Sequence, residues 1–186
     1  GTYLLAFLSI YTRPHTIVAA SRWFHENVSP GATLLIQHWD EGFPFTLPGR
    51  PAEGFRIVEL PFYDAEGAEK TRLLADRLAS GDVLVLQTKR LYGAITRAKE
   101  RYPDTDRLFR LLFAGDLGYT LVRTFSSPPR LLGVSLPSEL ADESFSVYDH
   151  PKAVVFRNAD RLTSTEISRR LRAATPSKSL SRSDLL

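Results

Sequence analysis

The chain has 186 residues, of which 43% are apolar, 24% are charged and 11% are aromatic. This composition is that of one water-soluble domain and excludes a disordered or fibrous segment. A chain of this length buries a core without help from a metal or a disulfide. Because it contains no cysteine, thiolate zinc sites, iron–sulfur clusters, cysteine nucleophiles and disulfides are excluded.

The formal net charge of +3 comes from the C-terminal part of the chain. Residues 1–156 hold 17 Lys+Arg against 18 Asp+Glu, whereas residues 157–186 hold 7 against 3. The body of the protein therefore has no average positive field, and its basic and aromatic side chains are not concentrated in one segment. We predict no nucleic-acid binding on this ground.

Residues 2–11 form an uncharged and mostly apolar run, TYLLAFLSIY. About 20 such residues are needed to cross a bilayer, so ten cannot span it. Two interpretations stay open: a first buried strand or helix, or the trailing end of a transmembrane helix that begins upstream. A signal peptide is disfavoured because no basic region precedes the run and no small-residue cleavage site follows it. Since the chain has no methionine, even at position 1, we expect it to be a piece of a longer protein.

Helical and strand patterns then alternate along the first half of the chain. Short apolar runs bounded by turn residues predict buried strands, and apolar residues at helical spacing predict amphipathic helices. In order, we expect a helix over 15–28, a strand over 33–37, a breaker-rich loop over 38–54, a strand over 55–60, a helix over 67–79 and a strand over 83–87.

The second half continues the pattern and ends in a polar tail. We expect helices over 91–101 and 106–114, strands over 119–125 and 131–136, a hairpin of 145–148 with 153–156, an arginine-rich helix over 163–173 and disorder over 175–186. Asp104 or Thr105 is the expected cap of the second helix.

Helix-length segments between the early strands imply parallel crossovers. We therefore predict an α/β fold: a layered domain with a mostly parallel sheet flanked by helices and an antiparallel C-terminal hairpin. The expected organisation is an apolar stub over 1–11, the α/β domain over 12–158, a basic helix over 159–174 and a disordered tail over 175–186.

The sequence lacks the glycine-rich, phosphate-loop, nucleophile-elbow and zinc-protease signatures. Polar groups at strand ends remain, where open α/β sheets place ligands. The first is His38-Trp39-Asp40-Glu41-Gly42. Its imidazole and carboxylates suit a divalent ion or acid–base chemistry, and an exposed Trp39 suits stacking on a sugar ring. The structural alternative is also open, because a His-x-Asp pair supplies only two ligands and tryptophan commonly anchors a core.

Two further groups follow strands later in the chain. Lys89 and Arg90 precede a helix and suit an anion such as phosphate, or they pair with Asp82 or Glu100. The segment from Tyr148 to Pro151 is typical of a turn, with an Asp149–His150 functional pair as the alternative. His15 and His25, on the first helix, are expected to serve packing or solvation.

Several of these segments together resemble a known family. They are YTRPHT at 11–16, AASRW at 19–23, HWDEG at 38–42, RLYG at 90–93, ERYP at 100–103, LFAGDLGY at 112–119 and DESFSVYDHPKAVVF at 142–156. Their order resembles the C-terminal extramembrane region of the bacterial and archaeal YYY family of multi-spanning membrane proteins, over roughly residues 3–157. That family is similar to the lipid-carrier-dependent glycosyltransferases of the GT-C class, which contains the protein O-mannosyltransferases.

The resemblance implies that residues 3–10 end the last membrane helix and that the domain lies on the extracytoplasmic side of the cell membrane. GT-C enzymes carry their catalytic acid on an early loop that this chain does not contain. The resemblance therefore implies no catalytic residue, metal or cofactor in this chain. Its implied partners are the membrane portion of the same polypeptide and a glycan or protein acceptor.

Two other functions stay open: a free-standing α/β enzyme that uses His38, Asp40 and His150, and a carbohydrate- or partner-binding module that uses Trp39 and Tyr92. The candidate ligand-binding residues are His38, Trp39, Asp40, Glu41, Lys89, Arg90, Tyr92, Asp149 and His150.

Overall fold

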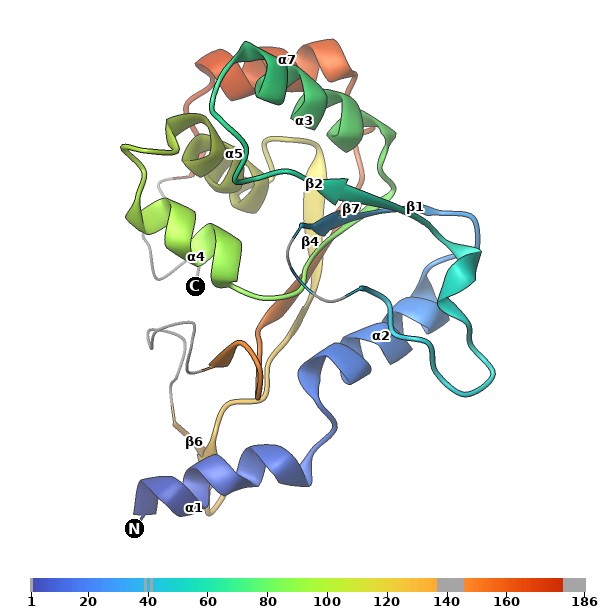
Figure 1. Ribbon diagram of the computed structural model, residues 1–186, viewed down its shortest axis with the longest axis vertical. Helices are drawn as coiled ribbons and strands as arrows, with labels where there is room; N and C mark the ends of the chain where they lie inside the picture. Colours follow the sequence, from blue (N-terminus) through green and yellow to red (C-terminus); the bar gives the residue numbers. More distant parts are fainter. Residues whose placement is uncertain (1, 39, 41, 137–145, 179–186) are drawn as a thin grey trace.

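The computed structural model describes residues 2–38, 40, 42–136 and 146–178, which build a five-stranded sheet with helices on both faces (Figure 1). The helices are α1 (Thr2–Leu8), α2 (Thr16–Asn27), α3 (Ala68–Ser80), α4 (Arg90–Arg97), α5 (Pro103–Ala114) and α7 (Ser164–Ala173), with 3-10 turns η1 (Ser9–Thr12) and η2 (Ala52–Gly54). The strands are β1 (Thr33–Gln37), β2 (Arg56–Leu60), β3 (Val83–Leu86), β4 (Tyr119–Phe125), β5 (Arg130–Leu131), β6 (Val134–Ser135) and β7 (Ala153–Asn158). The α/β fold class is confirmed.

The five strands lie in the order β2-β1-β3-β7-β4. β1 pairs in parallel with both β2 and β3, with Leu35 opposite Val58 on one side and Leu84 on the other. β7 is antiparallel to its neighbours β3 and β4. The sheet therefore has a parallel part, β2-β1-β3, which is extended by the antiparallel strand β7 and then by β4 at the edge.

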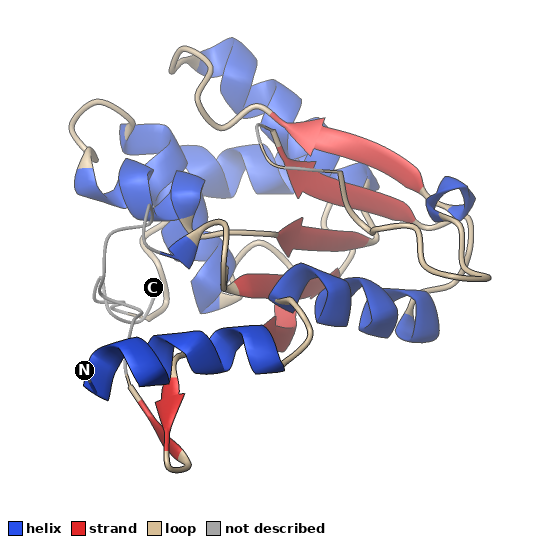
Figure 2. Ribbon diagram, turned by 60° about the horizontal axis from the view of Figure 1, so that its bottom comes forward, coloured by secondary structure: helices blue, strands red, loops and turns tan. Residues whose placement is uncertain are grey.

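Alternate residues of the central strands fill two separate cores. Leu35, Leu84 and Phe156 face the layer formed by α3, α4, α5 and α7. Their neighbours Leu34 and Val155 face α2 on the other side of the sheet. Figure 2 shows α2 beside the sheet, opposite the larger helical layer. Because both faces are covered, β3 is apolar along its whole length, and β1 and β7 contain continuous apolar stretches, LLI and AVVF, as buried strands do.

Several predicted boundaries agree with the structure to within one or two residues, among them those of α2, α3, β1, β4 and α7. Helix α5 is an exception, because it begins at Pro103, three residues before the predicted start. Proline at the first helical position needs no hydrogen-bond donor and has a helical φ already, so it starts the helix where Asp104 or Thr105 was expected to cap it. Helix α4 ends at Arg97 rather than Arg101.

Two predicted strands differ from the structure. The expected strand over 131–136 is a small separate hairpin, β5–β6, because Leu132 and Gly133 turn the chain with φ of 48° and 84°. The expected hairpin of 145–148 with 153–156 does not form within the described residues: Ser146–Asp149 make a helical turn, and β7 pairs with β3 and β4 instead. Phe145 lies outside the described residues.

Helix α7 docks on the domain. The side chain of Thr163 accepts a hydrogen bond from Glu166 N and caps the helix, while Ile167 and Leu171 are buried in the core shared with α3 and α5. Arg169 and Arg170 both pair with Glu166, and Arg170 also donates to the Asp116 carbonyl of the domain. The part of the predicted tail beyond Lys178 lies outside the described residues.

The apolar N-terminal run is helical. In α1 and η1, Ala6 and Ile10 are buried, whereas Leu4, Leu5 and Leu8 are at least half exposed. Within the described residues, no helix is both long and apolar enough to cross a bilayer.

Candidate functional site

The carboxyl ends of β1 and β3 meet at a topological switch point of the sheet. From β1 the chain passes to β2 on one side, and from β2 it crosses to β3 on the other side of β1. Open α/β sheets bind ligands at this position, because the loops after the two strands diverge and leave a crevice. Here these loops contribute Asp40 after β1 and Thr88 and Arg90 after β3.

A hydrogen-bonded cluster closes the floor of this crevice. The Thr88 hydroxyl donates to Asp40 Oδ2 at 3.0 Å and accepts from Gln37 Nε2 at 3.0 Å and from the Arg90 amide at 3.2 Å. Gln37 Nε2 also contacts Asp40 Oδ2. The Asp40 side chain is only 5% exposed. The buried carboxylate is therefore held in one position by polar partners from both strand ends, as a buried charge requires.

A cavity of about 210 Å³ opens above the cluster. Its polar lining includes Asp40, Gln87, Thr88 and Arg90, and its apolar lining includes Ile17, Phe45, Val147, Tyr148 and Pro151. The Arg90 guanidinium lies 5.5 Å from the centre of the Tyr148 ring and 3.9 Å from Asp40 Oδ1. The cavity thus combines opposite charges, an amide and a hydroxyl with aromatic rings, which is the composition of a small-ligand site.

His15 also lines this cavity, although packing or solvation was expected for it. Its Nδ1 accepts a hydrogen bond from the Ile17 amide and so caps α2. Its Nε2 lies 2.9 Å from the Tyr148 carbonyl oxygen. In this arrangement Nδ1 is the acceptor and Nε2 is the donor, because the Ile17 amide needs an acceptor and the Tyr148 carbonyl needs a donor. Both ring nitrogens are engaged, so His15 fixes the position of Tyr148 at the mouth of the cavity.

Of the sequence-predicted residues, the structure brings Asp40 and Arg90 together. Arg90 does not pair with Asp82, because Asp82 binds Arg161 at 2.6 Å and accepts from the Thr33 amide at the opposite end of the sheet. Lys89 precedes α4 and is buried rather than presented to an anion.

His38 lies apart from this cavity. Its Nδ1 pairs with the Glu59 carboxylate, and it lines a different surface hollow together with Ile57 and Arg77. His38 and Asp40 therefore face different spaces and do not form the acid–base pair of a free-standing enzyme. No cluster of three or more His, Asp or Glu side chains suited to a metal ion occurs among the described residues. Trp39 and Glu41 lie outside the described residues.

The remaining candidates have contacts within the fold. Tyr92 is fully buried, and its ring packs against Phe109 and Phe113, so it is not exposed for stacking on a ligand. Asp149 accepts a hydrogen bond of 2.7 Å from the Tyr11 hydroxyl. His150 is buried, with its ring edge-on to Phe7. The segment 148–150 is thus a turn that joins the cavity to the N-terminal helical segment.

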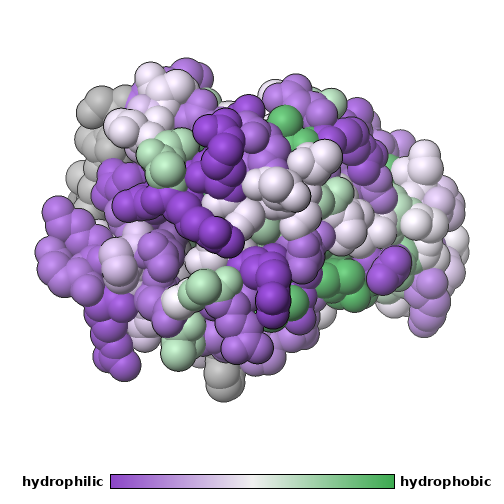
Figure 3. Space-filling view, turned by 90° about the horizontal axis from the view of Figure 1, so that it is seen from above, coloured by the Kyte–Doolittle hydropathy of each residue, from purple (hydrophilic) through white to green (hydrophobic). Residues whose placement is uncertain are grey.

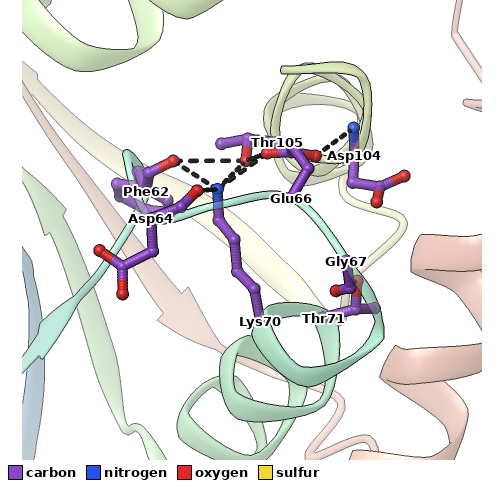
Figure 4. Close-up of polar contacts among 8 residues, drawn as sticks. All are labelled: Phe62, Asp64, Glu66, Gly67, Lys70, Thr71, Asp104 and Thr105. Atoms are coloured by element: carbon purple, nitrogen blue, oxygen red, sulfur yellow. Dashed lines mark hydrogen bonds and ion pairs between the residues drawn. The ribbon is translucent and has the colours of Figure 1, made fainter. Parts of the chain in front are cut away.

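Lys70 forms a second polar cluster that was not expected from the sequence (Figure 4). Its ammonium donates to the Phe62 and Asp64 carbonyls, to Thr105 Oγ1 and to Glu66 Oε1, at 2.6 to 2.8 Å. Glu66 also accepts from the Asp104 amide and the Thr105 hydroxyl. Protein acceptors therefore surround the buried ammonium, and we assign this cluster to holding α5 against the β2–α3 loop.

The sequence contained one overlooked signal for the site. Each of the two buried strands ends in glutamine, TLLIQ at 33–37 and VLVLQ at 83–87. A buried glutamine requires hydrogen-bond partners at the strand end, so this pair of amides marks the edge where polar groups gather. Gln37 and Gln87 now appear there, with Thr88 between Gln37 and Arg90.

These features define a mixed α/β domain with a small polar and aromatic cavity at the switch point of its sheet. Comparison with protein-family models, with curated proteins and with solved structures found no match for this chain.

Proposed function

We propose that this chain is an extracytoplasmic accessory domain of a multi-spanning membrane protein and that it recognises a sugar in the switch-point cavity. The observation that carries the proposal is the cavity of about 210 Å³ where Asp40 and Arg90 lie beside the Tyr148 ring. Sugars are bound by charged and amide groups that exchange hydrogen bonds with hydroxyls, and by aromatic rings that pack on the apolar face of the pyranose.

The charges favour a neutral ligand over phosphate. Arg90 attracts an anion, but the Asp40 carboxylate lies 3.9 Å from its guanidinium and faces the same cavity. A phosphate would therefore sit next to a negative charge in a partly desolvated space, which is unfavourable. A hydroxyl group accepts from the guanidinium and donates to the carboxylate, so a polyhydroxylated ligand satisfies both at once.

The N-terminal segment supports the membrane part of the proposal. Leu4, Leu5 and Leu8 are exposed on one face of α1, an arrangement that is unfavourable in water. The exposed leucines would be favourably placed if the segment adjoined a bilayer, because their side chains would then contact lipid instead of water. The ordered motifs that resemble the YYY family support the same proposal, a domain that adjoins the membrane portion of a GT-C-like glycosyltransferase.

Calorimetric titration of the chain with methyl glycosides of mannose, glucose and galactose, and separately with inorganic phosphate, tests the ligand. We expect at least one glycoside to bind, and Asp40→Asn and Arg90→Gln each to weaken it about tenfold, since each removes a charged hydrogen-bond partner. Asp160→Asn, on an exposed loop, is the matched control and should bind normally. Binding of phosphate alone, or glycoside binding that none of these variants changes, would refute the assignment.

A further inference from the structure

The tip of the β5–β6 hairpin exposes an apolar side chain where the backbone favours a polar one. Leu132 is 97% exposed and has φ of 48°, and Gly133 follows with φ of 84°. A two-residue turn with two positive φ values is commonly Asn-Gly, because these residues tolerate the left-handed conformation. Leucine here costs conformational energy and exposes apolar surface, so an external contact is its simplest explanation.

Other exposed apolar side chains lie at the same end of the molecule. Val134, on β6, is 64% exposed, and the exposed leucines of α1 belong to the helix against which β5 packs. Figure 2 shows the hairpin projecting beside α1, away from the five-stranded sheet. The opposite end, formed by α3 and α7, carries mainly hydrophilic residues (Figure 3). The molecule is therefore polarised, with apolar groups from two separate elements gathered at the α1 end.

The α1 end is also positively charged. The Arg13 guanidinium donates to the Pro128 carbonyl at 2.6 Å and to the Ser9 carbonyl at 3.4 Å. The backbone amide of Arg130 donates to Ser9 Oγ, and its guanidinium donates to Ser135 Oγ at 3.2 Å. Neither arginine has a carboxylate partner among the described residues, and burial and the charge of Arg130 lower the pKa of Arg13. The sequence has no Asp or Glu in 2–25 or in 126–136, the described stretches that contain α1, η1 and the β5–β6 hairpin. The Asp149 carboxylate accepts a hydrogen bond of 2.7 Å from the Tyr11 hydroxyl.

We propose that the β5–β6 hairpin and the outer face of α1 dock on an anionic lipid bilayer, with Leu132 and Val134 at the acyl boundary and Arg13 and Arg130 against lipid phosphates. Apolar side chains that project beyond arginines with no carboxylate partner in the described part of the chain suit the layered chemistry of a membrane surface, where headgroup phosphates lie above the hydrocarbon. The proposal deepens the membrane-adjacent part of the proposed function and rests on it. It does not depend on the sugar cavity.

Flotation of the full 186-residue chain with vesicles tests the docking. The probes are mixed phosphatidylcholine–phosphatidylglycerol vesicles, with pure phosphatidylcholine vesicles for comparison. We expect the chain to partition onto the anionic vesicles. Leu132→Asn should reduce partition about tenfold, the effect of losing one inserted leucine. Arg130→Gln should reduce it about fivefold on anionic vesicles and leave it unchanged on neutral ones.

The Leu132→Asn variant separates a loss of lipid contact from a loss of folding. Asparagine suits the positive φ at position 132, so L132N should melt no lower than the parent chain. The matched controls are Leu73→Ser on α3 and Arg56→Gln on β2, which change exposed residues away from the α1 end. Both control variants should partition onto anionic vesicles as the parent chain does.

Three results would overturn the proposal: no flotation of a folded chain, flotation that Leu132→Asn leaves unchanged, or self-association through Leu132 without lipid. Because the glycoside titration uses different variants and no lipid, failure of this proposal and failure of the sugar assignment are distinguishable.

Discussion

The Thr88 hydroxyl donates a hydrogen bond of 3.0 Å to Asp40 Oδ2, and so joins the ends of two strands across 48 residues of sequence. Thr88 Oγ1 also accepts hydrogen bonds from Gln37 Nε2 and from the Arg90 amide. With one bond donated and two accepted, the hydroxyl uses its full hydrogen-bonding capacity. One hydroxyl therefore sets the position of both charged groups of the cavity, Asp40 directly and Arg90 through its backbone.

Thr88→Val should lower both stability and ligand affinity. Valine has nearly the same shape but removes the hydrogen bonds that the hydroxyl makes with the buried Gln37 amide and the Asp40 carboxylate, at a cost of about 1–3 kcal/mol in the free energy of unfolding. Urea denaturation measures the cost. Thr96→Val is the matched control, because Thr96 is also buried but its hydroxyl bonds only to carbonyls of its own helix. A loss no larger for T88V than for T96V would contradict the role of the cluster.

Removing the hydroxyl group from two buried tyrosines, Tyr92 and Tyr119, should have different effects on the free energy of unfolding. Within the described part of the chain, the Tyr92 hydroxyl has no hydrogen-bond partner, whereas the Tyr119 hydroxyl donates to the Leu78 carbonyl at 2.7 Å. Burial raises the pKa of both phenols. Tyr92→Phe should keep or raise the free energy of unfolding, and Tyr119→Phe should lower it by about 1 kcal/mol. Thermal or urea unfolding of the two single variants measures this difference. A larger loss of stability for Y92F than for Y119F would contradict the assigned hydrogen bonding of the two hydroxyls.

Acid should weaken the Lys70 cluster. Burial alone would raise the pKa of Glu66, but hydrogen bonds from Lys70, Thr105 and the Asp104 amide outweigh it and hold that pKa below its usual value. A depressed folded-state pKa contributes stability above the unfolded pKa of about 4.3, and this contribution is lost as the pH falls through the folded value.

Glu66→Gln should therefore be less stable than the parent at neutral pH and should lose less stability on acidification. Urea unfolding at neutral pH and at about pH 3 measures the difference. Lys70→Met tests the same cluster from the other side: it leaves Glu66 and two carbonyls without their buried donor and should cost about 3 kcal/mol. If E66Q and the parent chain lost the same stability on acidification, protonation of Glu66 would not be the cause of that loss.

The sequence predicted those elements whose signal is local. The short apolar runs at 33–37 and 83–87, bounded by turn residues, predicted β1 and β3, and apolar residues at helical spacing predicted α2 and α3. The antiparallel insertion of β7 between β3 and β4 was not predicted, because strand order depends on which edges the helices leave open. A turn over Ser146–Asp149 was mistaken for a strand, since Val147 and Tyr148 have high strand propensity that tertiary contacts override.

The site was predicted only in part for the same reason. Asp40 and Arg90 follow strands, and strand ends are a general location of ligands, so both were candidates. Their contact through Thr88, and the approach of His15 and Tyr148 to the same cavity, join segments far apart in sequence. Tyr92 was expected at a binding surface, but its position on the inner face of α4 places it in the core.

The most direct test of the account is a nitrogen-15 NMR titration of the chain with the methyl glycosides. If the cavity binds a sugar, the backbone amides of Thr88, Arg90 and Tyr148, which surround it, should show saturable shifts. The amide of Asp160, on an exposed loop, should stay unchanged as the internal control. No shift at high glycoside concentration, or shifts confined to amides away from the switch point, would contradict the claim that this cavity recognises a sugar.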